Sequence, residues 1–215
     1  MGSSNNATPG PVMQLLSSGL QFWVRQQCQA IDSLDLQLQG SAMGLLRGQL
    51  AGVRLMARRV VYQNLQLELV ELTSSPIAVN IGAMLKGQPL QLQQPFTIEG
   101  QISFSADGLT QSLTHPQWRE LGDQLADALL GITPLVELRI GQNQLIVAAQ
   151  PAGDQPRVEV ECALKVVEGS VAICPRGGEL EVRLPLDPGI SVERANLEGG
   201  MVQLFGQARV SIGGP

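Results

Sequence analysis

Two adjacent arginines, Arg58 and Arg59, are the residues of this 215-residue chain whose type and spacing best suit ligand chemistry. They are the only neighbouring pair of basic residues, and they stand where an alternating apolar pattern changes phase. A guanidinium group can donate two parallel hydrogen bonds to a phosphate, so the pair predicts a site for a phosphate-bearing ligand. Three further cations, Arg47, Arg54 and Lys86, could gather with this pair at one rim of a sheet. Alternatively, all five cations are scattered surface charges.

The sequence offers little for catalysis or for metal binding. Its one histidine, His115, directly precedes Pro116 and is predicted to lie in a loop at a helix start. Nucleophile-elbow, phosphate-loop, dinucleotide-binding and zinc-protease patterns are all missing. Two pairs of carboxylates are expected to face solvent and are interpreted as solubility charges: Asp32 with Asp35, and Glu68 with Glu71. We therefore predict a protein that is not an enzyme and that uses no cofactor and no metal ion.

The three cysteines, Cys28, Cys162 and Cys174, show no metal-type spacing. Cys162 and Cys174 are predicted on neighbouring strands joined near Glu168-Gly169. A three-residue turn there would bring the two thiols opposite each other, whereas a two-residue turn would put them on different faces. Because the count is odd and no export signal is seen, buried free thiols are expected rather than a disulfide.

Composition and charge exclude several classes of protein. Apolar residues make up 44% of the chain, aromatic residues 3% and charged residues 15%, and the net charge is −5. Without a basic stripe or an aromatic stacking surface, nucleic-acid binding is not expected. The first ten residues, MGSSNNATPG, are polar and do not resemble a signal peptide, so we expect a disordered terminus 1–10 and a cytoplasmic protein. Peripheral, transient contact of the protein with a membrane surface is kept as an alternative.

The strongest pattern is the alternation of apolar and polar residues between residues 47 and 92. It forms three runs, Val53–Ala57, Leu65–Leu69 and Ile77–Ile81, whose polar positions hold mostly Gln, Asn, Arg and Glu. Such alternation predicts an antiparallel sheet with one covered apolar face and one solvated face. The phase changes at 58–62 and at 69–72 predict β-bulges, which bend strands and let the sheet coil around other elements.

An amphipathic helix of about 18 residues is predicted from Pro11, because apolar residues recur at helical spacing up to Ile31. It could pack on the sheet, or it could lie on a membrane with Phe22 and Trp23 at the interface. Its polar face carries only Arg25 as a cation, which favours packing on the sheet.

A helical segment follows a long strand over 96–104 that is expected to kink at Gly100. Asp107 is the predicted N-cap of a short helix, and Pro116 is predicted to open a second helix that ends at Gly131. The apolar side of the second helix is expected to consist of Trp118, Leu121, Leu125, Ala128 and Leu129.

All later segments alternate as strands, over 135–140, 144–149, 157–167, 179–184, 190–197 and 201–210. The order is one helix, about five strands, a helical segment and about six more strands. This order predicts an α+β fold in which a long, strongly coiled antiparallel sheet wraps around two or three helices. No change in composition forces a boundary, so residues 11–212 are expected to form a single domain.

Three segments resemble a known family: RLMARRVVYQNLQL from Arg54, IAVNIGAMLKGQPLQL from Ile77 and FTIEGQISFSADGLTQSL from Phe96. They are similar to the LmeA-like bacterial family, and the similarity spans residues from about Val12 to Val210. The resemblance implies a phospholipid-binding domain, shaped like a tubular lipid-binding half-barrel. It implies no catalytic residues.

We predict that the protein binds, and in one version transfers, phospholipid or another acyl lipid in an apolar groove between the coiled sheet and the helices. Arg58 and Arg59 are the predicted head-group residues. The alternative is a protein-interaction or scaffold domain with a self-filled core and no bound lipid. The predicted lipid-lining residues are Val53, Leu55, Leu67, Leu69, Val79, Ile81, Phe104, Leu121, Leu125 and Leu129.

Overall fold

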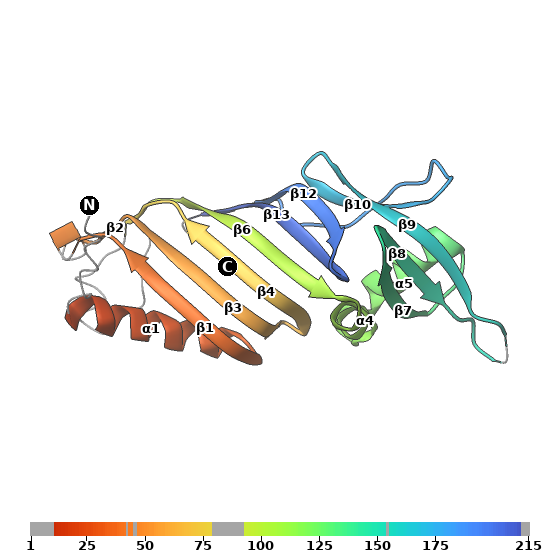
Figure 1. The fold of residues 1–215 in the computed structure, drawn as a ribbon, viewed down its shortest axis with the longest axis horizontal. Coiled ribbons are helices and arrows are strands. Elements are labelled where there is room, and N and C mark those ends of the chain that lie inside the picture. Colours follow the sequence, from red (N-terminus) through yellow and green to blue (C-terminus); the bar gives the residue numbers. More distant parts are fainter. Residues whose placement is uncertain (1–10, 42, 45–46, 79–92, 154, 212–215) are drawn as a thin grey trace, which may run out of the picture.

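The computed structural model describes residues 11–41, 43–44, 47–78, 93–153 and 155–211, and the expected disordered segment 1–10 lies outside them. Within these ranges the chain forms two large antiparallel sheets, a two-stranded ribbon and the helices α1, α4 and α5 (Figure 1). The predicted α+β fold, in which antiparallel sheet wraps around helices, is confirmed, and the strands divide between two sheets.

The larger sheet combines strands from both ends of the chain. Its order is β1 (Ala30–Gln39), β3 (Gly52–Tyr62), β4 (Leu65–Ser74), β6 (Phe96–Ser105), β13 (Met201–Val210) and β12 (Ile190–Glu198). All neighbours are antiparallel, and the pairing of β6 with β13 joins the N-terminal strands to the C-terminal hairpin. The short ribbon pairs β2 (Gln49–Leu50) with β5 (Ile77–Ala78). Helix α1 (Pro11–Gln27) lies along β1, at the outer edge (Figure 1).

The smaller sheet is built from one continuous stretch of chain. Its order is β11 (Val182–Arg183), β10 (Ser170–Pro175), β9 (Val158–Val167), β8 (Gln144–Ala149) and β7 (Leu135–Gly141). Helix α5 (Arg119–Leu130) packs on this sheet, and α4 (Ala106–Thr114) contacts both β4 and β7 (Figure 1). Helix α4 therefore lies at the junction of the two sheets.

Opposed residues of the larger sheet place most of its apolar side chains on one side, because directly opposed residues of antiparallel strands share a face. One row crosses all six strands: Leu36, Leu55, Leu72, Gly100, Gly206 and Val192. A second row lies two residues along each strand, or three along β12, where the register shifts between Val192 and Arg194: Leu34, Ala57, Val70, Ile102, Leu204 and Ala195. We call the side that carries these rows the apolar face. The opposite side, the polar face, carries the intervening row of Asp35, Met56, Glu71, Gln101, Phe205 and Arg194.

The phase change predicted at 58–62 occurs at Arg59, whose φ is 45°. Ala57 and Val60 are both buried in one cluster, although they are three residues apart. The register of β3 with β1 and with β4 continues through this point, so the phase changes without an inserted residue. Both predicted β-bulges, at 58–62 and at 69–72, are therefore wrong, because the residues at both places pair in continuous register with both neighbouring strands.

The helix ends differ from the predictions in their details. Ser105 rather than Asp107 caps α4, and its hydroxyl accepts a hydrogen bond from the Gly108 amide at 3.1 Å. The next helix begins at Arg119, three residues after Pro116, and ends as predicted at Gly131, which adopts φ 65°. Ala128 was expected on the apolar side of this helix but is exposed, while Ala126 is fully buried.

The relative positions of Cys162 and Cys174 are set by the β9–β10 turn, which contains two residues, Glu168 and Gly169. Cys174 therefore opposes Ala163 and Cys162 opposes Pro175, so the two thiols lie on different faces. Both are buried and free. Burial raises the pKa of the Cys162 thiol to about 11, which keeps it protonated at neutral pH.

Candidate functional site

The apolar face of the larger sheet is only partly covered. At one end it is closed by the smaller sheet, because Phe104 and Val202 are buried and Leu197 packs against the core of that sheet. Between this end and α1 the face holds buried side chains, Leu36, Ala57, Val70 and Val192. Several others are half-buried and retain contact with solvent: Leu55, Leu72, Ile98, Ile102, Leu204 and Ala208. An apolar surface that is left partly exposed is a candidate site for an apolar ligand.

Helix α1 contacts the larger sheet at its β1 edge. The Ser17 hydroxyl donates a hydrogen bond of 3.0 Å to the Leu36 carbonyl, and Leu20 and Val24 are half-buried at helical spacing. Among the α1 side chains that the structure describes, none is fully buried. Cys28, directly after the helix, packs against the cluster formed by β1, β3 and β4.

Two opposed glycines interrupt the apolar face in the middle of the sheet. A Cβ on Gly100 would lie 2.0 Å from the Glu71 carbonyl oxygen, and one on Gly206 would lie 2.3 Å from the Ser191 carbonyl oxygen. Neither site has room for a side chain, because the neighbouring backbones approach too closely. Gly100 and Gly206 oppose each other, so two adjacent positions of the apolar face present only backbone between Leu72 and Val192.

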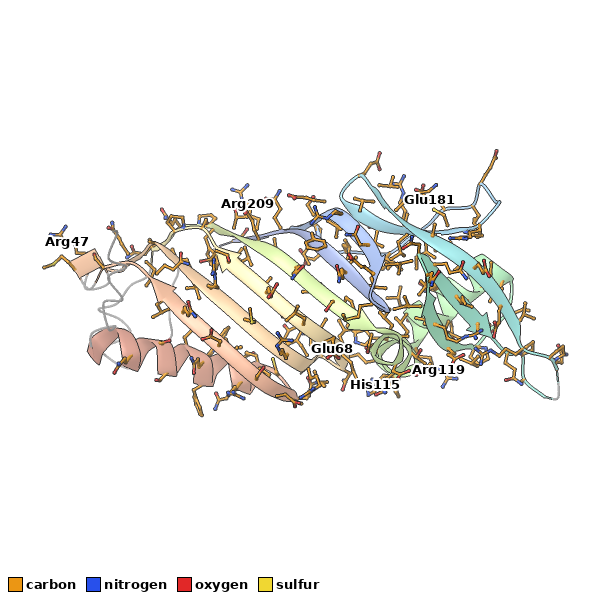
Figure 2. All side chains as sticks on the ribbon, in the orientation of Figure 1. Arg47, Glu68, His115, Arg119, Glu181 and Arg209 are labelled. Carbon is orange, nitrogen blue, oxygen red and sulfur yellow. The ribbon has the colours of Figure 1, made fainter. Side chains whose placement is uncertain are left out.

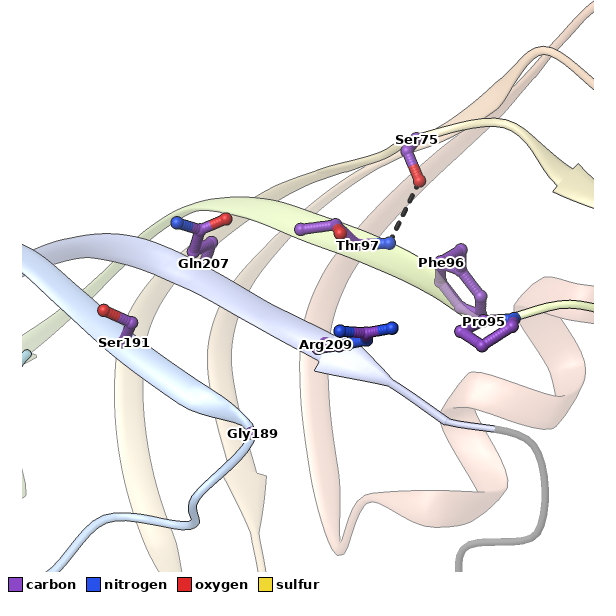
Figure 3. Close-up of a pocket in the computed structure, with 8 residues that line it drawn as sticks. All are labelled: Ser75, Pro95, Phe96, Thr97, Gly189, Ser191, Gln207 and Arg209. Atoms are coloured by element: carbon purple, nitrogen blue, oxygen red, sulfur yellow. Dashed lines mark hydrogen bonds between the residues drawn. The ribbon is translucent and has the colours of Figure 1, made fainter.

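A polar hollow of about 390 Å³ lies at one end of the larger sheet, where β6 and β12 begin and β13 ends (Figure 3). A second hollow, of about 430 Å³, lies between β9 and β12. The described residues that line the first hollow are Ser75, Pro95, Phe96, Thr97, Gly189, Ser191, Gln207 and Arg209. Those that line the second are Asn143, Ala163, Leu164, Ala195, Asn196, Leu197 and Glu198.

The structure separates the predicted lining residues into two groups. Val53 opposes Leu38, and Leu55 and Leu67 pack in the cluster of the larger sheet, while Phe104 is buried at the closed end of its apolar face. Leu69 opposes Arg58 and Ser103 and so shares the polar face with them.

The second group belongs to α5. Leu125 is 2% exposed within the core of the smaller sheet, Leu129 packs against that core, and Leu121 is half-buried. Val79 and Ile81 lie outside the described residues. The described members of the predicted set line neither hollow.

The predicted head-group arginines, Arg58 and Arg59, have different surroundings. Arg59 forms an ion pair with Asp32, whose carboxylate raises the pKa of this guanidinium by accepting its hydrogen bond, and Glu68 adds a smaller attraction. Arg58 is exposed on the polar face, opposite Ser33 and Leu69. With one arginine beside two carboxylates, the local charge is already compensated.

The other predicted cations are dispersed. Arg54 is exposed opposite Gln37 and Thr73, and Lys86 lies outside the described residues. Figure 2 shows Arg47 at one extreme of the molecule, away from Glu68.

Arg209 lines the first hollow, and no local sequence pattern marked it in advance. It stands at an ordinary polar position of an alternating strand, and it reaches the hollow only because β13 pairs with β6. Pairing between segments so distant in the chain leaves no local pattern in the sequence.

Metal and proton chemistry have little support in the part of the chain that the structure describes. There, no group of three histidine, cysteine, aspartate or glutamate residues could hold a metal ion. His115 follows α4, and its Nδ1 accepts a hydrogen bond of 3.2 Å from the Gln117 amide. No helix within the described ranges is long and apolar enough to cross a membrane.

Within the described residues, the larger antiparallel sheet carries an apolar face that is incompletely covered. The family model described as LmeA-like phospholipid-binding matches residues 10–207, and the chain belongs to this family. The family expected from the sequence is thereby confirmed, and its description is of a phospholipid-binding domain rather than an enzyme. Neither the curated proteins nor the solved structures contain a match.

Proposed function

We propose that this protein binds phospholipid without catalysis and holds the acyl chains on the apolar face of the larger sheet, beside α1. The observation that carries the proposal is the half-buried state of that face between α1 and the closed end, at Leu55, Leu72, Ile102 and Leu204. The description of the family supports the same ligand class.

The energetics favour such a ligand. Each methylene removed from water contributes about 0.8 kcal/mol, so a long acyl chain can bind well without any polar contact. The same burial would cover side chains such as Leu72 and Ile102, which the protein's own elements leave half-buried.

The alternative function, a protein-interaction domain with a self-filled core, describes only part of the molecule. It fits the smaller sheet, where Leu125, Val147 and Cys162 are at most 2% exposed. It does not account for the partly uncovered apolar face of the larger sheet.

Native mass spectrometry and lipid extraction of the purified full chain test the proposal, together with uptake of a fluorescent phospholipid from vesicles. We expect co-purified phospholipid and saturable uptake. A protein that carries no lipid and takes up none from vesicles would overturn the proposal.

We also propose that α1 touches a membrane surface during lipid exchange. Phe22 and Trp23 are 64% and 56% exposed on this helix, and aromatic rings of this kind favour the membrane interface. In a Trp118→Phe background, Trp23 is the only tryptophan, and its emission should shift to the blue when phospholipid vesicles are added. Identical emission with and without vesicles would contradict this contact.

A further inference from the structure

The second hollow lies where the two sheets meet, between β9 and β12 (Figure 1). At one end of this junction, the Val192 amide donates a hydrogen bond of 2.7 Å to the Gly169 carbonyl, just beyond the end of β9. The hollow lies further along both strands, at 195–198 of β12 and at 163–164 of β9. The junction is therefore bonded at one end and hollow at the other.

The second hollow borders the apolar face, because β12 is the last strand of the larger sheet and side chains of both faces meet at its outer edge. Ala195 lines the hollow and also ends the second row of the apolar face, next to Leu204 and then Ile102. All three side chains are half-buried. An acyl chain that follows this row across the strands from the direction of α1 therefore arrives at the second hollow. Arg209 in the first hollow, by contrast, holds a polar-face position.

The polar side chains of the second hollow are one carboxylate and two primary amides. Glu198 and Asn196 come from β12, and Asn143 comes from the turn between β7 and β8. Among the described residues that line this hollow, none carries a positive charge. In the described part of the chain, no lysine or arginine nitrogen lies within 4.0 Å of the Glu198 carboxylate.

This set of groups suits a ligand that carries several hydroxyls. A carboxylate accepts hydrogen bonds, an amide both donates and accepts them, and a hydroxyl can answer either. A phosphate inside the hollow would meet the like charge of Glu198. An ammonium group fits less well than a hydroxyl, because the Arg176 guanidinium lies at the same turn and donates a hydrogen bond of 3.2 Å to the Asn143 carbonyl.

We propose that the second hollow binds the hydroxyl groups of a polyol head group, such as the glycerol of a phospholipid. Glu198, Asn196 and Asn143 are the hydrogen-bond partners, and the phosphodiester stays at the rim, on the side of Arg176. The inference rests on the proposed function, and it places the head group here rather than at the predicted arginine pair.

The experiment compares two phospholipids with identical acyl chains and equal charge, phosphatidylglycerol and phosphatidylethanol, presented to the full chain in neutral carrier vesicles. The head group of the first carries hydroxyls and that of the second carries none. Glu198→Ala is the test variant. Glu193→Ala is the matched control, because Glu193 is also an exposed carboxylate of β12 but lines neither hollow. Circular dichroism confirms that both variants fold.

We expect the wild-type protein to bind phosphatidylglycerol about fivefold more tightly than phosphatidylethanol, which is the effect of a small number of hydrogen bonds. Glu198→Ala should abolish this preference, and Glu193→Ala should keep it. Since the two lipids carry the same charge, the loss of a carboxylate by itself changes both affinities alike and leaves their ratio unchanged. An unchanged ratio in Glu198→Ala would overturn the proposal, as would an equal loss of preference in Glu193→Ala.

Calorimetric titration with free glycerol separates a lipid head group from a free polyol. We expect no saturable binding of free glycerol, because it has no acyl chain to bury. Tight glycerol binding that requires Glu198, combined with a lipid preference that does not, would assign the hollow to a free polyol and overturn its role in lipid binding. If the wild type binds neither lipid, the proposed function fails, and with it the head-group assignment. If the wild type binds both lipids equally, only the head-group assignment fails.

Discussion

The two sheets of this protein share the same alternation of apolar and polar residues, but they bury their apolar faces to different extents. On the smaller sheet, α5 completes a closed core in which Val147 and Cys162 are fully buried. On the larger sheet, the described residues form a small buried cluster of Ala57, Val60 and Val70, and the apolar residues packed against it are half-buried. An apolar face that no helix fully covers is costly in water. We infer that the smaller sheet carries stability and the larger one carries binding.

The largest expected difference is in stability. Leu125→Ala should lower the free energy of unfolding by about 3 kcal/mol, because it leaves a cavity in a closed core. Leu55→Ala should cost only about 1 kcal/mol, since Leu55 on the apolar face is already half-buried. Urea unfolding of both variants, measured without lipid, checks the contrast. Equal losses would show that the two halves are packed alike.

A second effect tests the glycine row of the larger sheet. Gly100→Ala should destabilise the fold by about 2 kcal/mol, because its Cβ would meet the Glu71 carbonyl oxygen at 2.0 Å. Gly19→Ala on α1 is the control, since nothing lies within 4 Å of the added atom and helices favour alanine. If the urea midpoint of Gly100→Ala equals that of the wild type, the central strands are packed less closely than the structure shows.

The third test concerns binding and uses two adjacent residues of β3. Leu55 lies on the apolar face and Met56 on the polar face. Leu55→Gln should weaken uptake of a fluorescent phospholipid by about tenfold, because a polar group then meets the acyl chain. Met56→Gln should leave uptake unchanged. Similar losses in both variants would remove the apolar face from the proposed function.

Local features of the fold were predictable from the sequence. Periodicity located α1, which begins at Pro11 as predicted, and it located β8 at Gln144–Ala149 without error. Gly131 ended α5, because its left-handed conformation suits glycine. These signals are local, since they depend on residues a few positions apart.

The division into two sheets could not be predicted in the same way. Alternation shows that Leu55 and Val147 each face an apolar environment, but it does not say which strands pair. The pairing of β6 with β13 is a contact between distant segments, and it alone brings Arg209 to the hollow. The predicted lining set therefore mixes residues of a closed core, such as Leu125, with residues of the partly uncovered face, such as Leu55.

The smallest expected effect concerns charges on the outside of the smaller sheet. Glu137 and Glu159 alternate with Arg139 and Arg157 in a closed set of ion pairs. Hydrogen bonding to Arg157 lowers the pKa of Glu137 below its ordinary value, and attraction to Arg157 and Arg139 lowers it further.

A carboxylate whose pKa is lower in the folded state stabilises the fold above its unfolded pKa, and this contribution disappears as the pH falls through the folded value. Glu137→Gln should therefore lower the urea midpoint slightly at neutral pH and match the wild type in acid below that pKa. High salt should shrink the neutral-pH difference, because these charges are exposed and screened. A difference that persisted unchanged in acid would mean that Glu137 acts through packing. The charge of Glu137 would then not contribute to the stability of the smaller sheet. The greater stability of this sheet relative to the larger one would come from its buried core.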